Sequence, residues 1–338
     1  MTLPNDMLAI AITAPGGPEV LRSVRQLLPV PGPGEVLIRV AAAGINAPDL
    51  QQRRGSYPPP PGASPLPGLE VAGEIIALGQ GKPRFTPGAR VVALCNGGGY
   101  AEYVAVPEGQ VLPLPQGWSL VEGAALPETY FTIQQTLVMR AGLAPDMHVL
   151  VHGGAGGIGG AAIVISRLYG ALPIAVVSSA EKQDYCRSLG AIAAIDRSRE
   201  DFVARTREIA DGGVERVVDI VGGQTLAKNL EVAATEAHLL LLASLSGRQA
   251  EINTGHIVSK RLTLHGSTLR PQPPAVKAAV AASLEEKVWP ALSHGKTAKP
   301  AIETFRLEDA AEAHRSMERP GHFGKTVMLT DFGRQEGK

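Results

Sequence analysis

The stretch HVLVHGGAGGIGG, His148 to Gly160, decides the fold of this 338-residue chain. A short apolar run leads directly into six glycines, of which Gly154, Gly156 and Gly159 have the spacing G-x-G-x-x-G. In such a loop the first glycine permits a tight turn, the second lets a pyrophosphate approach the backbone, and the third lets the following helix pack on the strand. Because a helix beginning there presents free N–H groups to an anion, the stretch predicts a dinucleotide site.

The residues around this loop alternate between short apolar runs and helical patterns, as in a parallel sheet with crossover helices. The first helix is predicted to stop at Gly170, and another to begin near Ser198, which stands three residues before Asp201 in the spacing of a capping box. Six strands, the number in a complete dinucleotide-binding sheet, favour a cofactor site over a bare strand–helix turn. The predicted strands are His148–Val151, Ile174–Val177, Ala193–Ile195, Val217–Val221, His238–Ala243 and Leu262–Gly266.

The two ends of the chain differ in texture from this middle part. Gly34–Gly44 and Gly88–Cys95 are apolar runs bounded by turn residues and predict strands of an irregular, mostly β domain. Between them, Ser56–Gly68 contains six prolines, which predict a stiff extended loop. After Arg270–Pro274 the sequence predicts one helix and a final strand at Lys325–Leu329.

Composition excludes several classes of partner. Lys plus Arg and Asp plus Glu both number 32, so no net charge attracts nucleic acid or an anionic membrane. Apolar runs such as His238–Leu245 are far shorter than the roughly 20 residues of a membrane span. The N-terminal segment lacks the basic region of a secretory signal, so we expect a soluble, cytoplasmic protein. Cys95 and Cys186 fit no metal-binding spacing and are expected in the core.

The end of the second predicted strand indicates which dinucleotide is bound. An NAD site usually has an acidic residue there, which binds the ribose 2′-hydroxyl. Here Ser178 and Ser179 take that position, and Lys182 follows in the next helix. Because hydroxyls and an ammonium suit a 2′-phosphate, the sequence favours NADPH. Glu181 would serve NAD instead if the strand ended later.

Four stretches together resemble the zinc-independent quinone oxidoreductases of the medium-chain dehydrogenase/reductase superfamily, and most closely their p53-inducible quinone reductase branch. The resemblance implies a Rossmann-type, doubly wound NADPH-binding domain at 131–271, inserted in a mostly β, GroES-like catalytic domain at 1–130 plus 272–338. It also implies homodimers joined through the sheet edge near His265–Leu269. The four stretches are Ala41–Ile75, Gly98–Pro107, Val149–Gly159 and Gly321–Leu329.

The metal ligands of zinc-dependent relatives are missing. Those proteins carry a cysteine, a later G-H-E stretch and a lobe of four cysteines. This chain reads GLEVAG at Gly68–Gly73, with Leu69 at the histidine position, and Asn46 lies beside the cysteine position. Because zinc requires several converging N, S or O donors, we expect no zinc. Without a Lewis acid the site suits acceptors that are easily reduced, such as quinones or activated enones.

The resemblance also implies roles for single residues. Asn46 and Tyr57 match the family's active-site motif and would donate hydrogen bonds to the substrate oxygen. Thr132 matches a threonine near the nicotinamide, and Lys325 a lysine close to the cofactor. Each residue also has a structural interpretation. Asn46 would be a common turn residue, and Tyr57 would pack on the prolines. Thr132 would bond to the backbone of its own helix, and Lys325 would be a surface charge. His152 matches the family pattern, yet a hydrogen-bonded core histidine is the preferred interpretation.

The remaining cofactor contacts are expected where ligands bind such sheets, at the carboxyl ends of the strands. Two positions depart from the family: Ala47 replaces an arginine and Ile133 an alanine, and the latter narrows the space beside Thr132. The expected cofactor-binding residues are Thr132, Gly154, Ala155, Gly156, Gly157, Ile158, Gly159, Ser178, Ser179, Lys182, Ala243, Leu245, Thr268, Leu269 and Lys325.

Three functions are compatible with these residues. The first is an NADPH-dependent quinone oxidoreductase that transfers hydride or single electrons to a small-molecule quinone. The second keeps the cofactor and reduces an enone or enoyl thioester. The third is a protein that binds NADPH without turnover.

Overall fold

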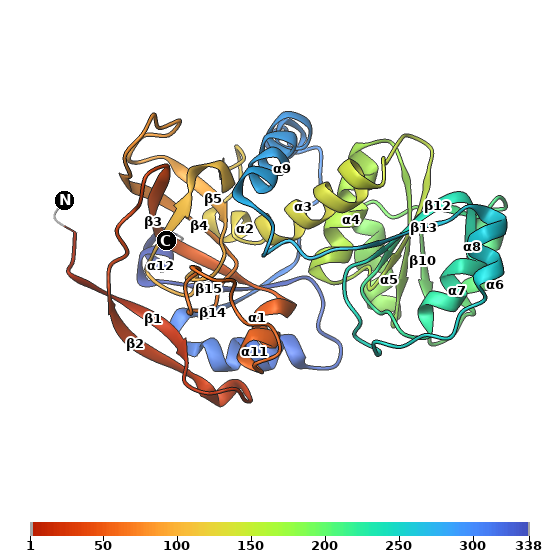
Figure 1. Ribbon diagram of the computed structural model, residues 1–338, viewed down its shortest axis with the longest axis horizontal. Coiled ribbons are helices and arrows are strands. Elements are labelled where there is room, and N and C mark those ends of the chain that lie inside the picture. Colours follow the sequence, from red (N-terminus) through yellow and green to blue (C-terminus); the bar gives the residue numbers. More distant parts are fainter. Residues whose placement is uncertain (1–2, 337–338) are drawn as a thin grey trace. The chain divides into compact units, whose positions relative to one another are not determined.

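The computed structural model describes residues 3–336, which form two compact units (Figure 1). Unit 1 comprises Met1–Phe131, Arg270–Gly295 and Pro300–Lys338, and unit 2 comprises Thr132–Leu269 and Lys296–Lys299. The chain therefore leaves unit 1 after Phe131, builds nearly all of unit 2, returns at Arg270, and belongs to unit 2 again only at Lys296–Lys299.

Unit 2 is built on one parallel sheet with the order β10-β9-β8-β11-β12-β13. The order reverses direction between β8 and β11, which makes the sheet doubly wound and confirms the predicted fold class. Its strands are β8 (His148–His152), β9 (Leu172–Val177), β10 (Ala193–Asp196), β11 (Val214–Asp219), β12 (Ala233–Leu241) and β13 (Thr263–Gly266).

Helices cover both faces of this sheet because its strands are apolar on both sides. Figure 1 shows α4 and α5 on one side of the strands and α6, α7 and α8 on the other. Gly170, with φ of +76°, follows the end of α4 as predicted. The helices are α4 (Gly157–Leu168), α5 (Ala180–Ser188), α6 (Phe202–Ile209), α7 (Thr225–Val232) and α8 (Thr254–Lys260).

Several sequence predictions for unit 2 were wrong in detail. Strand β12 spans Ala233–Leu241 rather than His238–Ala243. Asp201, not Ser198, caps α6: its carboxylate accepts the N–H groups of Val203 and Ala204. Ser198 is held instead in a turn, where its N–H and hydroxyl donate to Asp196. Strand β11 ends at Asp219 rather than at Val221, because the Asp219 carboxylate accepts backbone N–H groups of the loop that follows.

Unit 1 contains a sheet of order β14-β15-β3-β4-β5-β7, with β6 paired to β3, and a separate β1-β2 hairpin. The strands predicted from the sequence correspond to β3, β5 and β15, and Ser56–Gly68 contains neither helix nor strand, as expected. The strands are β1 (Asp6–Ile12), β2 (Leu21–Leu27), β3 (Glu35–Ile45), β4 (Glu70–Leu78), β5 (Arg90–Leu94), β6 (Tyr103–Pro107), β7 (Val111–Pro113), β14 (Ile302–Arg306) and β15 (Lys325–Leu329).

Beyond Arg270 the expectation of one helix and one strand was too simple, because short helices and β14 also form there. The helical segments outside unit 2's sheet are η1 (Pro18–Val20), α1 (Ala47–Arg53), η2 (Glu108–Gln110), α2 (Leu120–Gly123), α3 (Pro127–Ile133), the π-helix η3 (Gln134–Arg140), α9 (Pro274–Lys287), α10 (Trp289–Ser293), η4 (Leu307–Asp309), α11 (Ala310–Glu318) and α12 (Asp331–Glu336). Pro274 is the first residue of α9, and Pro290 is the second residue of α10. Because proline disrupts the interior of a helix, Pro290 separates α10 from α9.

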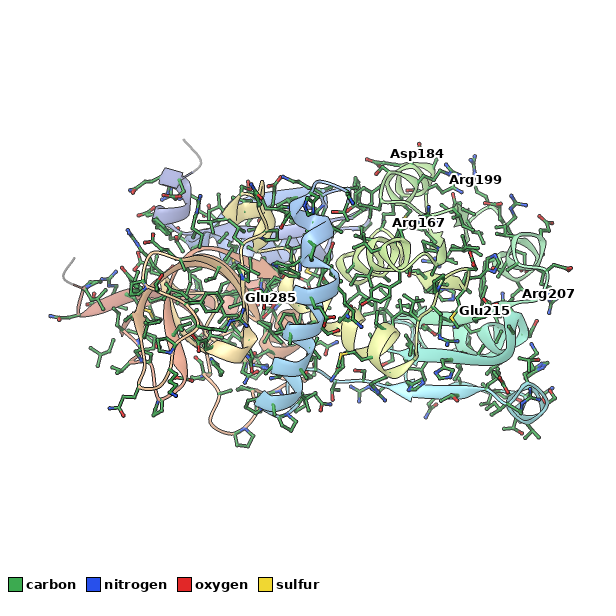
Figure 2. The ribbon with its side chains drawn as sticks, turned by 90° about the horizontal axis from the view of Figure 1, so that it is seen from above. Arg167, Asp184, Arg199, Arg207, Glu215 and Glu285 are labelled. Atoms are coloured by element: carbon green, nitrogen blue, oxygen red, sulfur yellow. The ribbon has the colours of Figure 1, made fainter. Side chains whose placement is uncertain are left out.

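The surface and the core agree with the composition. Arg167, Asp184, Arg199 and Arg207, which are labelled on unit 2 in Figure 2, are all exposed. Cys95 and Cys186 are both buried free thiols, as predicted. Within residues 3–336, none of the helices has the length and apolar character needed to cross a membrane.

Candidate functional site

The glycines between β8 and α4 divide into two kinds. A Cβ on Gly154 would lie 2.7 Å from the Ala175 Cβ, and one on Gly159 only 2.3 Å from the Gly153 carbonyl oxygen. These two glycines are therefore required by the packing of the helix on the sheet. A Cβ on Gly156 would meet nothing closer than 3.5 Å, so the fold itself leaves that position open.

The open position lies at the start of a helix. Gly156 is the N-cap residue of α4 and provides no side-chain cap, so the first N–H groups of this helix lack that partner. Gly157, Ile158 and Gly159 form its first turn. Bare backbone at Gly156 together with a helix N-terminus is an arrangement that fits the pyrophosphate of a dinucleotide.

The other expected cofactor residues of the sheet follow the carboxyl ends of neighbouring strands. Ala243 and Leu245 follow β12, and Thr268 and Leu269 follow β13. Because the strands are parallel, these segments and the glycine loop belong to the same edge of the sheet. Thr132 lies near the end of α3, where its carbonyl oxygen accepts the Thr136 hydroxyl at 2.7 Å.

A buried polar network that the sequence did not reveal supports this edge. The His152 Nε2 lies 2.7 Å from Asn229 Oδ1, and Asn229 Nδ2 donates to Asp219 at 3.0 Å. The other Asp219 oxygen accepts the N–H groups of Val221 and Gly222. Burial lowers the pKa of His152, so the ring is neutral. His152 is thus a hydrogen-bonded core residue, as preferred from the sequence.

The residues expected at a 2′-phosphate surround the end of β9. Ser178 is exposed directly after the strand, and Ser179 caps α5 by accepting the Lys182 N–H at 3.4 Å. A further cation, Arg197, was not predicted from the sequence. The backbone N–H of Arg197, after β10, donates to the Val177 carbonyl at 3.0 Å, so this exposed arginine is anchored beside the same strand end.

In unit 1, Asn46 and Lys325 meet at a buried carboxylate that the sequence analysis had not selected. Lys325 Nζ donates to Asn46 Oδ1 at 2.7 Å and to Glu70 Oε1 at 2.5 Å, and Asn46 Nδ2 donates to that oxygen at 2.8 Å. All three side chains are buried. Lys325 is therefore not a surface charge. A Cβ on Gly44 would lie 2.1 Å from Glu70 Oε1, so glycine on β3 provides the space for this carboxylate.

Two further carboxyl groups lie around this cluster. The Asp49 carboxylate accepts the backbone N–H groups of Asn46 and Gly68, while burial raises its pKa to about 6. Glu128 donates its backbone N–H to Glu70 Oε2 at 2.9 Å. Burial, with the charges of Glu70 and Asp49, raises the pKa of the Glu128 carboxyl to about 8, so this group is protonated at neutral pH.

Tyr57 lies against a second buried cluster. The Arg270 Cζ is 5.7 Å from the centroid of the Tyr57 ring, and Arg270 donates from Nε and Nη2 to the Asn96 carbonyl. Lys277 Nζ donates to the Arg270 carbonyl at 2.7 Å and also to Asn96 Oδ1. Burial and the charge of Glu128 raise the pKa of Tyr57, which remains a neutral phenol. The sequence around Tyr57 could not predict Arg270 and its hydrogen-bond partners, because they come from distant segments of the chain.

The residues present do not fit a catalytic zinc ion. Leu69 is buried in the core, where it provides no donor atom. Among residues 3–336, no three His, Cys, Asp or Glu side chains are grouped so that they could hold a metal ion. The Glu70 carboxylate next to Leu69 is instead paired with the Lys325 ammonium.

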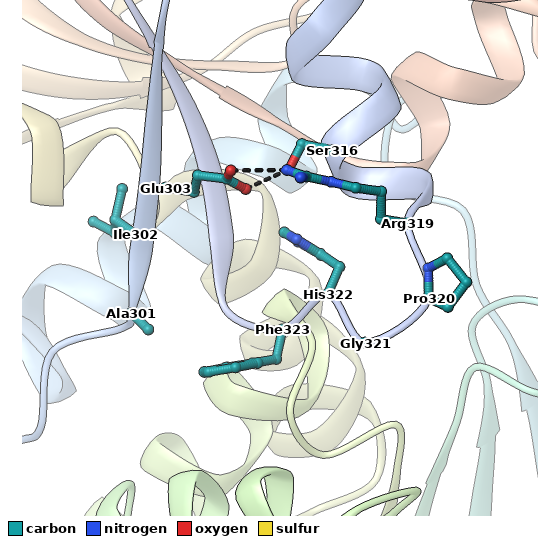
Figure 3. A pocket seen from close by; sticks show the side chains of 9 residues that line it. All are labelled: Ala301, Ile302, Glu303, Ser316, Arg319, Pro320, Gly321, His322 and Phe323. Atoms are coloured by element: carbon teal, nitrogen blue, oxygen red, sulfur yellow. Dashed lines mark hydrogen bonds and ion pairs between the residues drawn. The ribbon is translucent and has the colours of Figure 1, made fainter.

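A pocket of about 380 Å³ occurs elsewhere in unit 1, between β14 and the loop after α11 (Figure 3). Glu303 on β14 accepts hydrogen bonds from Arg319 at 2.9 Å and from Ser316, and both pairs are drawn in Figure 3. None of the residues expected to bind cofactor or substrate lines this pocket. It therefore does not contribute to the candidate site.

Known proteins resemble the chain over almost its whole length. A family described as alcohol dehydrogenase GroES-like domain matches residues 32–116, which confirms the predicted GroES-like domain, and one described as zinc-binding dehydrogenase matches residues 157–285. Quinone oxidoreductase from Homo sapiens is 30% identical over 331 residues, covering 96% of this chain and 98% of that protein.

Solved structures also resemble the chain over almost its whole length. An NAD-dependent alcohol dehydrogenase superposes with a TM-score of 0.83 at 30% identity, covering 96% of this chain and 99% of the other. A mycobacterial protein in complex with NADPH superposes with a TM-score of 0.82, also at 30% identity and with the same coverage.

Proposed function

The chain belongs to the medium-chain dehydrogenase/reductase superfamily, with quinone oxidoreductases among its relatives, and from this premise we propose that it is a zinc-independent, NADPH-dependent quinone oxidoreductase. The observation that carries the proposal is the loop at Gly154–Gly159, where two glycines are required by packing and the third, Gly156, is left open at an uncapped helix N-terminus. The quinone acceptor is supported by the human relative and by Leu69, which stands where zinc-dependent relatives carry a histidine ligand.

NADPH, when bound, supplies a hydride equivalent. We assign its pyrophosphate to the backbone of Gly156–Gly159 and its 2′-phosphate to Ser178, Ser179 and Lys182. Arg197 adds a guanidinium beside the same strand end, and such groups bind phosphate with paired hydrogen bonds. The hydroxyl of Ser179 accepts the Lys182 N–H and can still donate its own proton to a phosphate oxygen.

Asn46 is held ready to donate a hydrogen bond to the acceptor. Its amide oxygen accepts from Lys325 and one of its two N–H groups donates to Glu70, which fixes the rotation of the amide. The second N–H is the one that we assign to the acceptor oxygen. A donor held in place before the reaction stabilises negative charge as it develops on that oxygen without a reorganisation cost.

The proposal is tested with purified protein that has been treated with a chelator. We expect it to oxidise NADPH faster than NADH when an ortho-quinone is supplied, with no loss after chelation. Formation of a saturated product from a conjugated enone, with no quinone reduction, would assign the protein to the enone reductases instead. Tight NADPH binding without turnover of any acceptor would show a binding protein rather than an enzyme.

The family resemblance also supports a homodimer. Strand β13 is the last strand at one end of the unit 2 sheet, and we propose that two copies pair there. Light scattering of the purified chain measures the assembly mass, and a monomer at all concentrations would contradict this proposal.

A further inference from the structure

Arg270 is a buried cation, and one nitrogen of its guanidinium has no hydrogen-bond acceptor. Its side chain is 4% exposed, and Nε and Nη2 donate to the Asn96 carbonyl at 2.9 and 2.7 Å. Nη1 is also buried, and no residue of the described chain accepts a hydrogen bond from it. Leaving a buried donor unpaired is unfavourable, and more so for a charged group. A buried donor without an acceptor calls for an explanation, and a hydrogen bond to a bound ligand is one.

The guanidinium is fixed in place by its neighbours. Lys277 on α9 is buried and donates to the Arg270 carbonyl and to Asn96 Oδ1. A Cβ on Gly97 would lie 3.2 Å from Arg270 Nη2, so the backbone of this loop closes tightly on the arginine. A donor that is held from several sides loses little entropy when a ligand binds, which is the condition for preorganised electrostatic stabilisation.

The charges around Arg270 favour an oxygen that becomes negative. Glu128 and Asp49 are the carboxyl groups whose charges act on it. Burial raises the pKa of Glu128 to about 8 and that of Asp49 to about 6, so Glu128 is neutral at pH 7. Asp49 already accepts two backbone N–H groups. Neither carboxylate accepts a hydrogen bond from Nη1, whose positive charge is left for a ligand.

The position of Arg270 beside Tyr57 connects it to the acceptor. The Tyr57 ring centroid lies 5.7 Å from the Arg270 Cζ and Tyr57 is half-buried, so displacement of this ring would open the guanidinium to a ligand. A phenol and a guanidinium next to each other offer two donors, which suit two neighbouring oxygens such as those of an ortho-quinone. Tyr57 is the residue that the family motif assigns to the substrate.

We propose that Arg270 Nη1 donates a hydrogen bond to a carbonyl oxygen of the acceptor and stabilises the negative charge that develops there. The proposal rests on the proposed function. The acceptor takes up a hydride, which is two electrons and one proton, from the cofactor and a second proton from solvent, and a quinone thereby becomes a hydroquinone. Arg270 keeps its own protons, because a guanidinium is not deprotonated in proteins. It supplies the positive charge that a metal ion supplies in a zinc enzyme.

The test compares Arg270→Ala with Arg306→Ala, an exposed arginine of the same unit. For Arg270→Ala we expect kcat/KM for an ortho-quinone to fall by about 10²- to 10³-fold, as when one oxyanion donor is removed, with KM for NADPH unchanged. Millimolar guanidinium should restore part of the activity of this variant and should not affect Arg306→Ala. Full activity of Arg270→Ala, or no rescue by guanidinium, would overturn the proposal.

A second readout needs no turnover. The absorbance of 4-nitrocatechol, an ortho-dioxygenated ring, reports its ionisation, and a guanidinium favours the anion. We expect the wild-type protein to shift this spectrum and Arg270→Ala not to. If the wild type shifts the spectrum but reduces no quinone, the proposed function fails and the assignment of Arg270 stands. If the wild type causes no shift, the assignment of Arg270 fails.

Tryptophan emission shows whether the variants fold, because Trp118 and Trp289 are the two tryptophans of the chain and both lie in unit 1. Should Arg270→Ala unfold, Arg270→Lys keeps a charge and a donor to Asn96 but has no second nitrogen for the acceptor. We expect Arg270→Lys to lose the spectral shift with 4-nitrocatechol, and a retained shift would contradict the proposal.

Discussion

The candidate site of unit 2 consists of main-chain groups, whereas that of unit 1 consists of side chains. In unit 2 the glycine loop offers main-chain N–H groups, and all of it comes from one segment of the chain. In unit 1 the candidate site is made of buried side chains, since Lys325 meets Glu70 across 255 positions of sequence and Asn46 meets Glu70 across 24. A main-chain site is specified by local spacing, whereas a side-chain site exists only after distant strands have packed.

The two sites also differ in how they tolerate change. The unit 2 loop depends on the absence of atoms, because a Cβ at Gly154 or Gly159 would collide with backbone or with the strand. The unit 1 cluster depends on charge balance, because Glu70 and Lys325 compensate each other in the interior. Added volume should therefore damage unit 2, and removed charge should damage unit 1.

Loss of the buried ammonium is expected to have the largest effect. Lys325→Met leaves the Glu70 carboxylate buried without its cation, and we expect the free energy of unfolding of unit 1 to fall by about 3–5 kcal/mol. Denaturant titration followed by tryptophan emission measures this, because both tryptophans report on unit 1.

The double variant Glu70→Gln/Lys325→Met is its control. Removing both charges avoids an uncompensated ion, so the double variant should be more stable than Lys325→Met alone. Additive losses, or a single variant as stable as the wild type, would show that the ion pair does not balance the unit 1 cluster.

Adding one methyl group to the glycine loop is expected to separate folding from binding. A Cβ at Gly159 lies 2.3 Å from a carbonyl oxygen that cannot yield, so Gly159→Ala should destabilise unit 2 by about 1–3 kcal/mol. Gly156 has φ of −82° and open space, so Gly156→Ala should keep its melting temperature and lose NADP⁺ affinity.

Circular dichroism measures the melting of both variants and calorimetry measures their NADP⁺ binding. Equal affinity of Gly156→Ala and wild type would show that the pyrophosphate does not approach the main chain at this residue.

Acidification is expected to weaken unit 1 through His314. This ring is buried, hydrogen-bonded to Arg53 and Tyr100, and its pKa is lowered to about 3 by burial and the charge of Arg53. Between about pH 6.5 and 3 the unfolded chain binds the proton and the folded chain does not, so stability falls with falling pH by up to about 1.4 kcal/mol per unit.

His314→Gln should remove this part of the slope, measured by denaturant titration at several pH values. Glu128 and Asp49, whose pKa values are raised, act in the opposite sense in both proteins, so the difference between variant and wild type isolates His314. An unchanged slope in His314→Gln would contradict the assignment.

The smallest effect is expected at the start of α6. Asp201→Ala removes the cap and should cost about 1 kcal/mol, whereas Ser198→Ala should change stability by less than about 0.5 kcal/mol. Thermal melting by circular dichroism compares them. A larger loss of stability for Ser198→Ala than for Asp201→Ala would support the predicted capping box of Ser198 and Asp201.

Much of unit 2 could be predicted because each decision there is local. Strands β8 and β9, the glycine spacing and the end of α4 just before Gly170 all follow from apolar runs and turn residues within a few positions. The errors fell where a buried side chain overrides local preference. Asp219 ends β11 early, and Asp196 holds Ser198 away from the helix that it was expected to cap.

Unit 1 was less predictable for the same reason. Asn46 and Tyr57 could be selected by resemblance, but Glu70, Asp49, Glu128 and Arg270 gave no local signal, because acids and arginines are ordinarily surface residues. Only burial shows that they differ from the exposed charges of the helices.

The sequence by itself therefore determined the doubly wound sheet and the glycine loop, since periodicity and glycine spacing act over one turn or one strand. The tertiary structure alone decided the partners of Asn46 and Tyr57. Folding brings Lys325 on β15 to Asn46, and it brings Arg270 from the returning chain to Tyr57. Desolvation in the interior shifts the pKa values of buried charged residues, whereas the same residue types on the surface remain hydrated.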